Sequence, residues 1–545
     1  GASITLTCSP AASYIWSNGA NTQSITVTTT GSYYVTVTNT AGCTETSTVV
    51  NLKENPCNVQ HAPGSGKAIS FDGVEDEADA GASFTDQNFT VDMWVNPGAT
   101  QVTYADIIDN NHNQGQNWFC QQVGENTNEY YFGCSFGEGQ VFSHFSIKAN
   151  VWQHVSLVKS AIALETYVNG ILSESTPWSG AINFSNQFLR LGKWGGGGRN
   201  WKGSMDEVRI WNTALTQAQI RERMCHKITS SDTLFTNLVA YYNFDEGEGN
   251  IIYDGTANAT NGILINSPAR ITSGAAIGNA SSNNYTTTGL PGTSLGFNGQ
   301  DNFGVTYTAG TYTGEAGTHV YVVNGKPNTE NGFKPVASND RYFGIFNVNL
   351  EAPAYTAIYN YTGNPAVTPA NELDVRLFKR NSNNIVNWAN ANANLNVNAN
   401  TLTATGEHTE YILGLPCGNI DTTISTSGPV TFCEGGSVTL TCGPAASWLW
   451  SNGATTQSIT VTAGGSYFVQ VTNAEGCTLI SAAVKVKINC SPGSGNAVSF
   501  DGLNDRVDLG SSFSYQNFTV DMWVKPGTTQ VRNADLIDNN QTGFY

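Results

Sequence analysis

The chain has 545 residues and a formal net charge of −18, but only 12% of its residues are charged. Its surface must therefore be built largely from Asn, Thr, Ser and Gly, a composition that suits β-sandwiches and long loops rather than helical bundles. The excess of negative charge argues against nucleic acid and against an anionic membrane as partners. No apolar run reaches the roughly 18–20 residues that a membrane-spanning helix needs, so direct membrane insertion is not expected.

The end of the sequence repeats its beginning. The stretch from Cys8 to Cys43 recurs from Cys442 to Cys477, a constant offset of 434 residues. After a short slip, Ser-Phe-Asp72-Gly recurs as Ser-Phe-Asp501-Gly. The chain is thus about 1.25 copies of a unit of about 430 residues, which is too long for one solenoid repeat and implies several domains per unit. We expect the parent polypeptide to continue in both directions with more of the same.

Period-two alternation of apolar residues predicts an all-β chain of tandem β-sandwich modules. The expected modules are two small immunoglobulin-like sandwiches at 1–57 (without its first strand) and 424–490, a larger β domain at 65–270, a further sandwich at 271–416, and a truncated second copy of the larger domain at 494–545. Tyr167-Val-Asn-Gly170 predicts a hairpin. Thr216-Gln-Ala-Gln219 predicts a capping box that opens the one expected helix. The two Trp-Ser-Asn-Gly tryptophans, Trp16 and Trp450, are expected in the cores of the small modules.

Several motifs of the 65–270 region carry a family resemblance. Ser-Phe-Asp72-Gly, Phe89-Thr-Val-Asp-Met-Trp-Val, Trp152-Gln-His-Val and Met205-Asp-Glu-Val-Arg-Ile-Trp together resemble a laminin-G-like, concanavalin-type jelly roll. In combination with the small Cys-containing sandwiches, which look like immunoglobulin-like or PKD-like repeats, the chain resembles the repetitive secreted adhesins of Bacteroidetes, including gliding-type adhesins. The resemblance implies an extracellular, cell-surface location.

Calcium is the cofactor that the sequence favours, because acidic residues supply the oxygen ligands it prefers. In the laminin-G-like family the first and last strands run side by side, so the resemblance implies that Asp72 and Asp206 meet around a structural calcium. Glu75 and Asp76 follow Asp72 in the turn, and the second copy keeps Asp501 and Asp505. The alternative is that Asp72 only caps its turn and Asp206 pairs with Arg209.

Aromatic residues near Gly-rich loops are candidates for a glycan or protein contact, since aromatic faces stack on sugar rings. Trp118, Trp194 and Trp201 are the choices, with Tyr130 beside them, and core packing is the alternative for each. Catalysis is not expected. Carboxylates at the spacing that glucanases need along one strand are missing, as are a Gly-x-Ser-x-Gly elbow and a phosphate loop.

The eleven cysteines fall into an even set of eight per repeat, which suggests disulfides in an extracellular protein. The expected pairs are Cys433–Cys477, Cys442–Cys490, Cys8–Cys57, Cys120–Cys134 and, joining two domains, Cys225–Cys417. Free buried thiols are the alternative. Zinc is not expected, because no Cys-x-x-Cys pair exists.

Two Asp-Thr sites, at Thr233 and Thr422, resemble the short O-glycosylation signal of Bacteroidetes. The favoured reading of the whole is a fragment of a long, calcium-stabilised extracellular adhesin or structural filament that contacts surface glycans, other cells or a substratum and self-associates. A carbohydrate-binding lectin module is the first alternative. An accessory region of a secreted polysaccharide-degrading enzyme is the second.

Overall fold

The computed structural model confirms the all-β expectation. It describes residues 4–488, without 28–30, 53–63, 82–84, 111–117, 127, 137–140, 183–188, 298–300, 337–340 and 407–408, together with 498–500, 507, 522 and 524–529. Within these residues, strands alternate with turns, and helix is confined to α1 (Gln217–Arg223) and a 3-10 turn at Phe235–Asn237. None of the helices in the described part has the length and apolar character needed to span a bilayer.

The two small modules repeat the same strand pairings. The first consists of β1 (Ile4–Thr7), β2 (Ser13–Trp16), β3 (Ser24–Val27), β4 (Gly31–Tyr33), β5 (Val35–Thr38), β6 (Thr44–Thr46) and β7 (Val50–Leu52). The second consists of β36 (Ile424–Thr426), β37 (Thr431–Phe432), β38 (Val438–Cys442), β39 (Ser447–Trp450), β40 (Ser458–Val461), β41 (Gly465–Tyr467), β42 (Val469–Thr472), β43 (Thr478–Ile480) and β44 (Val484–Ile488). The pairings β1–β3, β2–β5–β6 and β4–β7 recur in the same register as β38–β40, β39–β42–β43 and β41–β44. Trp16 and Trp450 are buried, as predicted.

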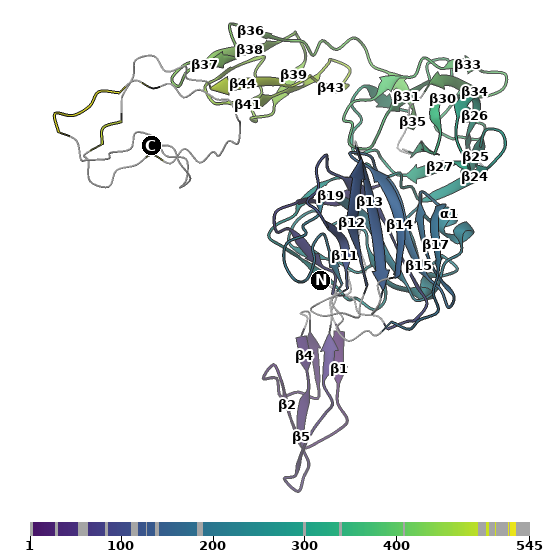
Figure 1. The fold of residues 1–545 in the computed structure, drawn as a ribbon, viewed down its shortest axis with the longest axis vertical. Coiled ribbons are helices and arrows are strands. Elements are labelled where there is room, and N and C mark those ends of the chain that lie inside the picture. The colour runs from purple at the N-terminus through teal and green to yellow at the C-terminus, as the bar shows by residue number, and fades with distance from the viewer. Residues whose placement is uncertain are drawn as a thin grey trace. The chain divides into compact units, whose positions relative to one another are not determined.

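Residues 67–272 form a sandwich of two eight-stranded sheets (Figure 1). The first sheet, in the order β17-β16-β15-β10-β19-β8-β23, contains β17 (Ile171–Pro177), β16 (Ala163–Val168), β15 (Gln153–Lys159), β10 (Phe89–Pro97), β19 (Lys202–Trp211), β8 (Lys67–Asp72) and β23 (Ala269–Thr272), with β20 (Leu238–Tyr242) beside β19. The second, in the order β14-β13-β12-β11-β18-β9-β22-β21, contains β14 (Val141–Lys148), β13 (Glu129–Phe136), β12 (Trp118–Asn126), β11 (Asp106–Asp109), β18 (Arg190–Leu191), β9 (Glu77–Asp79), β22 (Gly262–Ile265) and β21 (Ile251–Ile252).

The structure confirms two local predictions made for this sandwich, a hairpin and a helix capping box. The β16–β17 hairpin turns at Asn169 and Gly170, which both have positive φ, the backbone that an Asn-Gly turn supplies. Helix α1 begins with the predicted capping box, in which Thr216 and Gln219 satisfy each other's backbone. Its apolar residue Ile220 is buried on the outer face of the first sheet.

A third sandwich follows, again with two sheets. One contains β24 (Ala280–Thr286), β27 (Ala316–Asn324), β29 (Arg341–Val348), β35 (Glu410–Pro416), β31 (Arg376–Arg380) and β32 (Ala389–Asn390), with β28 (Phe333–Pro335) beside β35. The other contains β25 (Thr293–Phe297), β26 (Asp301–Thr311), β30 (Glu351–Asn360), β34 (Thr401–Gly406) and β33 (Asn394–Asn396). Its core is rich in Tyr and Phe from facing strands.

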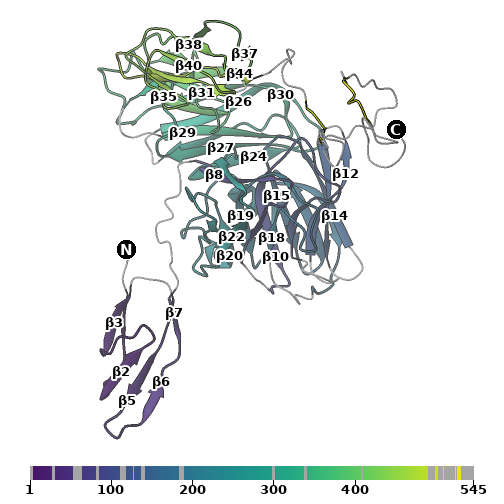
Figure 2. The same ribbon diagram turned by 90° about the vertical axis from the view of Figure 1, so that its left-hand side faces the viewer.

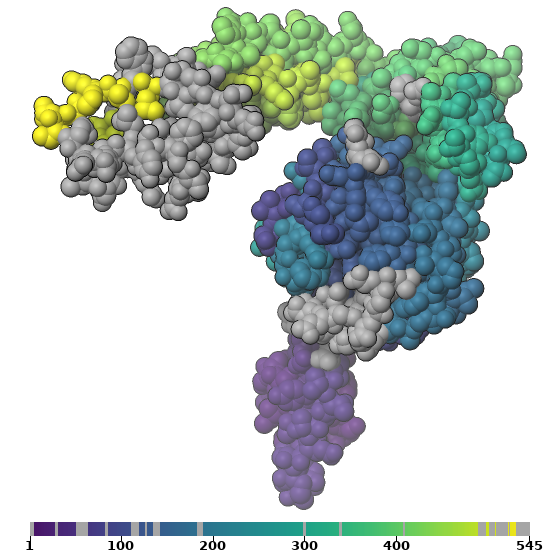
Figure 3. Space-filling view, in the orientation of Figure 1, coloured from purple at the N-terminus to yellow at the C-terminus, as the bar shows by residue number. Residues whose placement is uncertain are grey.

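The second and third sandwiches share a buried interface. Strand β10 alternates as predicted, yet its outward residues Thr90, Asp92 and Trp94 are as buried as its inward ones. Helix α1 and the third sandwich cover that face, and one apolar cluster joins Trp94 to residues of β27, β29 and β35. Figure 2 shows β24 and β27 next to β8 and β15, and Figure 3 shows the atoms of both sandwiches in contact. The two sandwiches are therefore one packed body rather than separate modules on a joint.

The disulfides follow the prediction in part. Cys120–Cys134 forms as expected, between β12 and β13. Cys477 pairs with Cys417 instead of Cys433, so the predicted pairs Cys433–Cys477 and Cys225–Cys417 are wrong. The reason is that β43 lies beside the third sandwich, which brings Cys477 to the end of β35.

Cys225, which was predicted to join two domains through Cys417, is instead a buried thiol in the shared apolar interface. The predicted partners Cys57 and Cys490 lie outside the described residues, so the pairs Cys8–Cys57 and Cys442–Cys490 stay predictions.

Candidate functional site

The predicted calcium ligands do not come together. Strands β8 and β19 do run side by side, but Asp72 is opposite Lys202 while Met205 is opposite Ile69. Asp72 and Asp206 are therefore separated by about four residues along the ladder, roughly 13 Å. This corrects the pairing that the resemblance implied.

Each of these carboxylates has a different task. Asp72 caps its own turn by accepting from the Val74 backbone N–H at 2.7 Å. Asp206 is fully buried and accepts from the Ser273 hydroxyl at 2.6 Å, and burial raises its pKa. Asp76 accepts from the Asp72 backbone N–H. The half of the alternative in which Asp72 caps its turn is thus confirmed.

The remaining predicted ligands are accounted for as follows. Glu75 is exposed and forms an ion pair with Lys193 at 2.5 Å. Asp501 and Asp505 lie outside the described residues. Arg209 pairs with Glu207 rather than with Asp206. Within the described residues, no group of three or more His, Cys, Asp or Glu side chains gathers as a metal site.

Of the two predicted ligand-binding tryptophans whose side chains the structure describes, one is placed to meet a ligand. Trp201 is completely buried in the core of the second sandwich, so this prediction is wrong. Trp194 is partly exposed, and the side chain of Trp118 lies outside the described residues. Tyr130 is also buried. Trp201 and Trp194 differ because the intervening glycines reverse the direction of the chain.

The outward face of the second sheet carries the groups that point to a binding site. In one row across the sheet, Asp106 on β11 lies opposite Gln121 on β12, Gln121 opposite Gly133 on β13, and Gly133 opposite His144 on β14. Three strand spacings make this row about 14 Å long. A Gly-rich loop, residues 192–200, lies against its β11 end, where the Asp106 N–H donates to the Arg199 carbonyl at 2.9 Å.

The loop leaves β18 through a tight backbone turn. Gly192 has φ +84°, and a Cβ there would lie 2.6 Å from the Phe71 ring, so only glycine fits. The Asp109 carboxylate accepts from the Gly195 N–H at 2.7 Å and holds the loop to β11. Arg199 then donates to the Gln121 side chain at 3.0 Å, and its guanidinium lies over the Trp194 ring, 4.4 Å from the centroid. The loop therefore presents an aromatic ring and a cation together.

Asp106 is the unusual group of this face. It is fully buried, and neither of its carboxylate oxygens has a hydrogen-bond partner. Burial, helped by the nearby charge of Asp109 and opposed by Arg199, raises the pKa of Asp106 to about 9. The side-chain oxygen of Asn200, whose backbone bridges to Asp106, is also buried without a donor. Buried acceptors without donors are costly, so this cluster is suited to a cation or to a proton held on Asp106.

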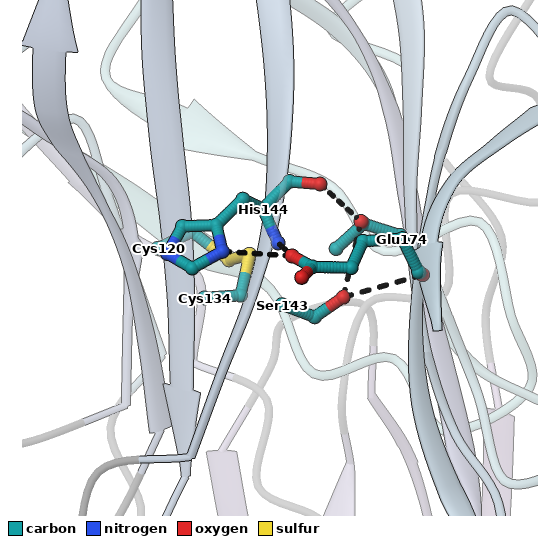
Figure 4. Close-up of a disulfide and its surroundings, with 6 residues drawn as sticks. Cys120, Cys134, Ser143, His144 and Glu174 are labelled. Atoms are coloured by element: carbon teal, nitrogen blue, oxygen red, sulfur yellow. Dashed lines mark hydrogen bonds and ion pairs between the residues drawn. A yellow bond between two sulfur atoms is a disulfide. The ribbon is translucent and has the colours of Figure 1, made fainter. Parts of the chain in front are cut away.

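The other end of the row is aromatic. His144 stacks on Tyr131 and on Phe142, with ring centroids 5.1 and 5.8 Å away. Its Nδ1 lies 2.7 Å from a Glu174 oxygen, which also accepts the His144 backbone N–H (Figure 4), so a side chain of β17 fixes the free edge of β14. Gly133 keeps this patch close to the sheet, since a Cβ there would lie 3.0 Å from the Phe142 ring.

The sequence contained a signal for these missed residues. The segment Ala105-Asp106-Ile-Ile-Asp109-Asn-Asn recurs as Ala534-Asp535-Leu-Ile-Asp538-Asn-Asn, so both carboxylates repeat in a stretch whose apolar residues alone would build a strand. The predicted glycosylation threonines carry no comparable signal. Thr233 is exposed and accepts from Arg223, Thr422 is half-buried, and glycosylation stays a prediction.

One family model matches the second sandwich. Residues 72–221 match a laminin-G-type family model described as the Concanavalin A-like lectin/glucanases superfamily. This part of the chain is thus a concanavalin A-like domain, as its motifs predicted. No curated protein matches the chain.

Three solved structures are similar in part. A Bacteroides ovatus protein assigned to carbohydrate binding is 18% identical, with a TM-score of 0.31 over 44% of this chain and 68% of its own. A SAP-like pentraxin of Limulus polyphemus is 18% identical, with a TM-score of 0.25 over 29% and 81%. Domain 4 of AbnA, an extracellular arabinanase of Geobacillus stearothermophilus, solved in complex with arabinotriose, is 22% identical, with a TM-score of 0.24 over 29% and 79%.

Proposed function

We propose that the 67–272 sandwich is a carbohydrate-binding module whose ligand lies along the row from Trp194 to Tyr131. The observation that carries this proposal is the pairing of exposed aromatic rings with polar groups on one sheet face. Tyr131 is 43% exposed, and Trp194 is flanked by Arg199 and by Tyr104, which is 47% exposed. Rings of this kind stack on sugar faces, while the guanidinium and the Gln121 amide bond hydroxyls.

Binding without catalysis fits the carboxyls of this face. Asp106 has the raised pKa of a general acid, and Asp109 is its neighbour on the same strand. Both are nevertheless almost completely buried beneath the loop, with exposed fractions of 0% and 1%. Neither can reach a glycosidic bond, whereas a glycosidase needs two carboxyls that flank it. The concanavalin-type match, which covers lectins as well as glucanases, is consistent with the binding role.

Replacing the loop tryptophan should weaken glycan binding. We expect the full chain to bind a defined set of oligosaccharides on a glycan array, and Trp194→Ala to lower the affinity about tenfold, since one stacked ring contributes roughly 1.4 kcal/mol. Tyr34→Ala is the control, because Tyr34 is an exposed aromatic residue in the first small module, outside the proposed binding row, and its replacement should change nothing. The proposal fails if the full chain binds no glycan, or if Trp194→Ala binds as tightly as the wild type.

We propose that the calcium of the sequence-based prediction binds at Asp106 rather than at Asp72. The oxygens of Asp106 and Asn200, with backbone carbonyls of the loop, are the donor type that calcium prefers. A cation there would hold the 192–200 loop, and with it Trp194 and Arg199, against β11. It would also keep Asp106 ionised, because metal ligands bind in their deprotonated form.

Calcium should stabilise the second sandwich through Asp106. At a calcium concentration 100 times Kd the gain is about 2.7 kcal/mol, which raises the melting temperature of a domain of this size by about 5–10 °C in calorimetry. Asp106→Asn should abolish this shift, whereas Asp72→Asn, which alters a capping carboxylate on the exposed turn, should leave it intact. A calcium shift that survives Asp106→Asn would exclude this site.

The same carboxyl predicts a pH dependence in EDTA. Its folded pKa of about 9 lies above the ordinary value of 3.8, so the folded state binds the extra proton between these values. Stability should therefore fall as pH rises from 6 to 8, by on the order of 1 kcal/mol per unit, and Asp106→Asn should flatten the slope. Unfolding in urea at pH 6, 7 and 8 measures how the free energy of unfolding changes with pH.

The repeat and the disulfides support an extracellular adhesive role for the longer protein. Disulfides such as Cys120–Cys134 and Cys417–Cys477 persist in oxidising compartments. The β11 segment of the binding face recurs at 534–540, so a polypeptide with several copies would hold several glycan sites. Linked weak sites raise the avidity for a glycan-coated surface without any new contact.

A further inference from the structure

Each of the two small modules has an equivalent edge strand, β6 in the first and β43 in the second. This strand is exposed in the first module and covered in the second. In the first module Cys43 is an exposed thiol, and all of β6, Thr44–Thr46, is exposed. In the second module Cys477 is only 4% exposed, and β43 is partly buried along its length. The edges are otherwise equivalent, because β5–β6 and β42–β43 pair in the same register.

The third sandwich is what covers the second edge. The Gly332 N–H donates to the Thr478 carbonyl at 2.8 Å, and the Thr478 hydroxyl donates to the Asn331 side chain at 2.5 Å. The Asn387 side chain makes two bonds to the backbone of Ile480, donating to its carbonyl at 2.9 Å and accepting from its N–H at 3.2 Å.

A disulfide closes the same contact. Cys417, directly after β35, is bonded to Cys477, directly before β43. The third sandwich and the second small module are thus held by one covalent bond and by four hydrogen bonds along the strand.

The first module retains every group that these bonds use. Cys43 replaces Cys477, and Thr44 supplies the same hydroxyl and carbonyl as Thr478. The two bonds to Asn387 need only backbone, which Thr46 supplies in place of Ile480. The turn before the strand is also the same in both modules. The Cys43 N–H donates to the Asn39 side-chain oxygen at 3.0 Å, and the Cys477 N–H donates to the Asn473 side-chain oxygen at the same distance.

We infer that Cys43 and β6 are a docking edge for a second copy of the 273–417 sandwich, carried ahead of residue 1 in the longer polypeptide. The docked state contains a disulfide between Cys43 and that copy's equivalent of Cys417. Two thiols lose two protons and two electrons, and a low-molecular-weight disulfide such as oxidised glutathione accepts them and becomes two thiols. The inference does not depend on glycan binding.

The sandwich of this same chain is not the occupant. Its docking surface at Asn331, Asn387 and Cys417 is already filled by β43. A second whole chain would bring the same filled surface. A copy joined ahead of residue 1 would instead reach β6 through the linker that joins Cys417 to β36 in this chain.

One side chain differs between the edge strands β6 and β43, and this difference adds a requirement on the surface of the docking partner. Leu479 reaches within 3.4 Å of the position a Cβ would take on Gly332, and Glu45 stands in its place in the first module. The preceding sandwich must therefore accept a carboxylate, not a leucine, at this point.

The test is a chain in which residues 65–434 are added ahead of Gly1, since Gly435 is the repeat equivalent of Gly1. After refolding in a glutathione redox buffer, peptide mapping without reduction should find the added copy's Cys417 bonded to Cys43, in a monomer. Cys43 should also lose its reaction with iodoacetamide, which labels it in the original chain. The added copy's Cys120–Cys134 bond reports that this copy has folded.

A second variant separates docking from chance oxidation. In the extended chain with Cys43→Ser, the Thr46 amide should still exchange with deuterium at least tenfold more slowly than in the original chain, because the hydrogen bonds of the edge remain. The inference is overturned if Cys43 stays reactive in the folded extended chain, if the bond forms only between two molecules, or if exchange at Thr46 is unchanged.

Discussion

Arg209→Ala should destabilise the second sandwich by about 3–5 kcal/mol, the cost of leaving buried charges without their partner. Arg209 is fully buried. It pairs with Glu207 at 2.7 Å, lies 3.6 Å from Asp92, and donates to the carbonyls of Arg223 and His226 at 2.9 Å. Its removal leaves the buried Glu207 and Asp92 carboxylates without their cationic partner, although Tyr241 still donates to Glu207 and Trp211 to Asp92. Calorimetry should show the main transition about 6–20 °C lower.

Two further variants test the reason for this loss. Arg209→Met combined with Glu207→Leu removes both charges of the closest pair and should recover most of the stability, because a buried ion pair contributes little over apolar packing. Lys326→Ala alters the exposed pair with Glu330, and should cost less than about 1 kcal/mol. The account is contradicted if Arg209→Ala melts with the wild type, or if the double variant is no better than the single one.

Strand positions were predictable from this sequence because alternation is a local property. The β16–β17 hairpin and the start of α1 depend on residues within a few positions of each other, and both are where the pattern placed them. The Cys120–Cys134 bond was predictable for the same reason, since the two cysteines flank one turn between neighbouring strands.

The site was not predictable because it depends on register and on coverage by distant residues. That β8 and β19 are neighbours followed from the resemblance, but a four-residue difference along the ladder decides whether Asp72 meets Asp206. Whether Asp206 is free for a metal depends on Ser273, which follows it by 67 residues. Trp194 lies in the 192–200 loop and Trp201 directly follows it, and positive φ at Gly197 and Gly198 between them breaks the period-two rule that would tell inside from outside.

The packing of the predicted tandem β-sandwich modules against one another is the feature that depends most on coverage by distant residues. Nothing in the alternation of Thr90, Asp92 and Trp94 distinguishes a solvated face from one that a second sandwich covers. An outward tryptophan in a strand is the one local hint, because large aromatic residues seldom remain exposed without a partner.

Trp94→Ala should therefore uncouple the second and third sandwiches. Trp94 is fully buried, its indole N–H donates to the Met224 carbonyl at 2.8 Å, and its ring meets Phe346 edge-on with centroids 5.0 Å apart. Truncation to alanine costs about 3–5 kcal/mol for a buried aromatic residue. Since the cavity opens in the shared cluster, we expect the single calorimetric transition of the two sandwiches to split into two.

Trp201→Ala is the matched control, because it removes the same side chain from the core of the second sandwich alone. It should lower stability by a similar amount while the two sandwiches, still joined through Trp94, continue to unfold together. Hydrogen exchange distinguishes the variants: amides of β29 should lose protection in Trp94→Ala under conditions where Trp201→Ala leaves them protected until global unfolding. If Trp94→Ala kept one cooperative transition, the packing between the sandwiches would not be what couples them, and the bonds of Asp206 to Ser273 and of Arg221 to Glu315 would have to carry the coupling instead.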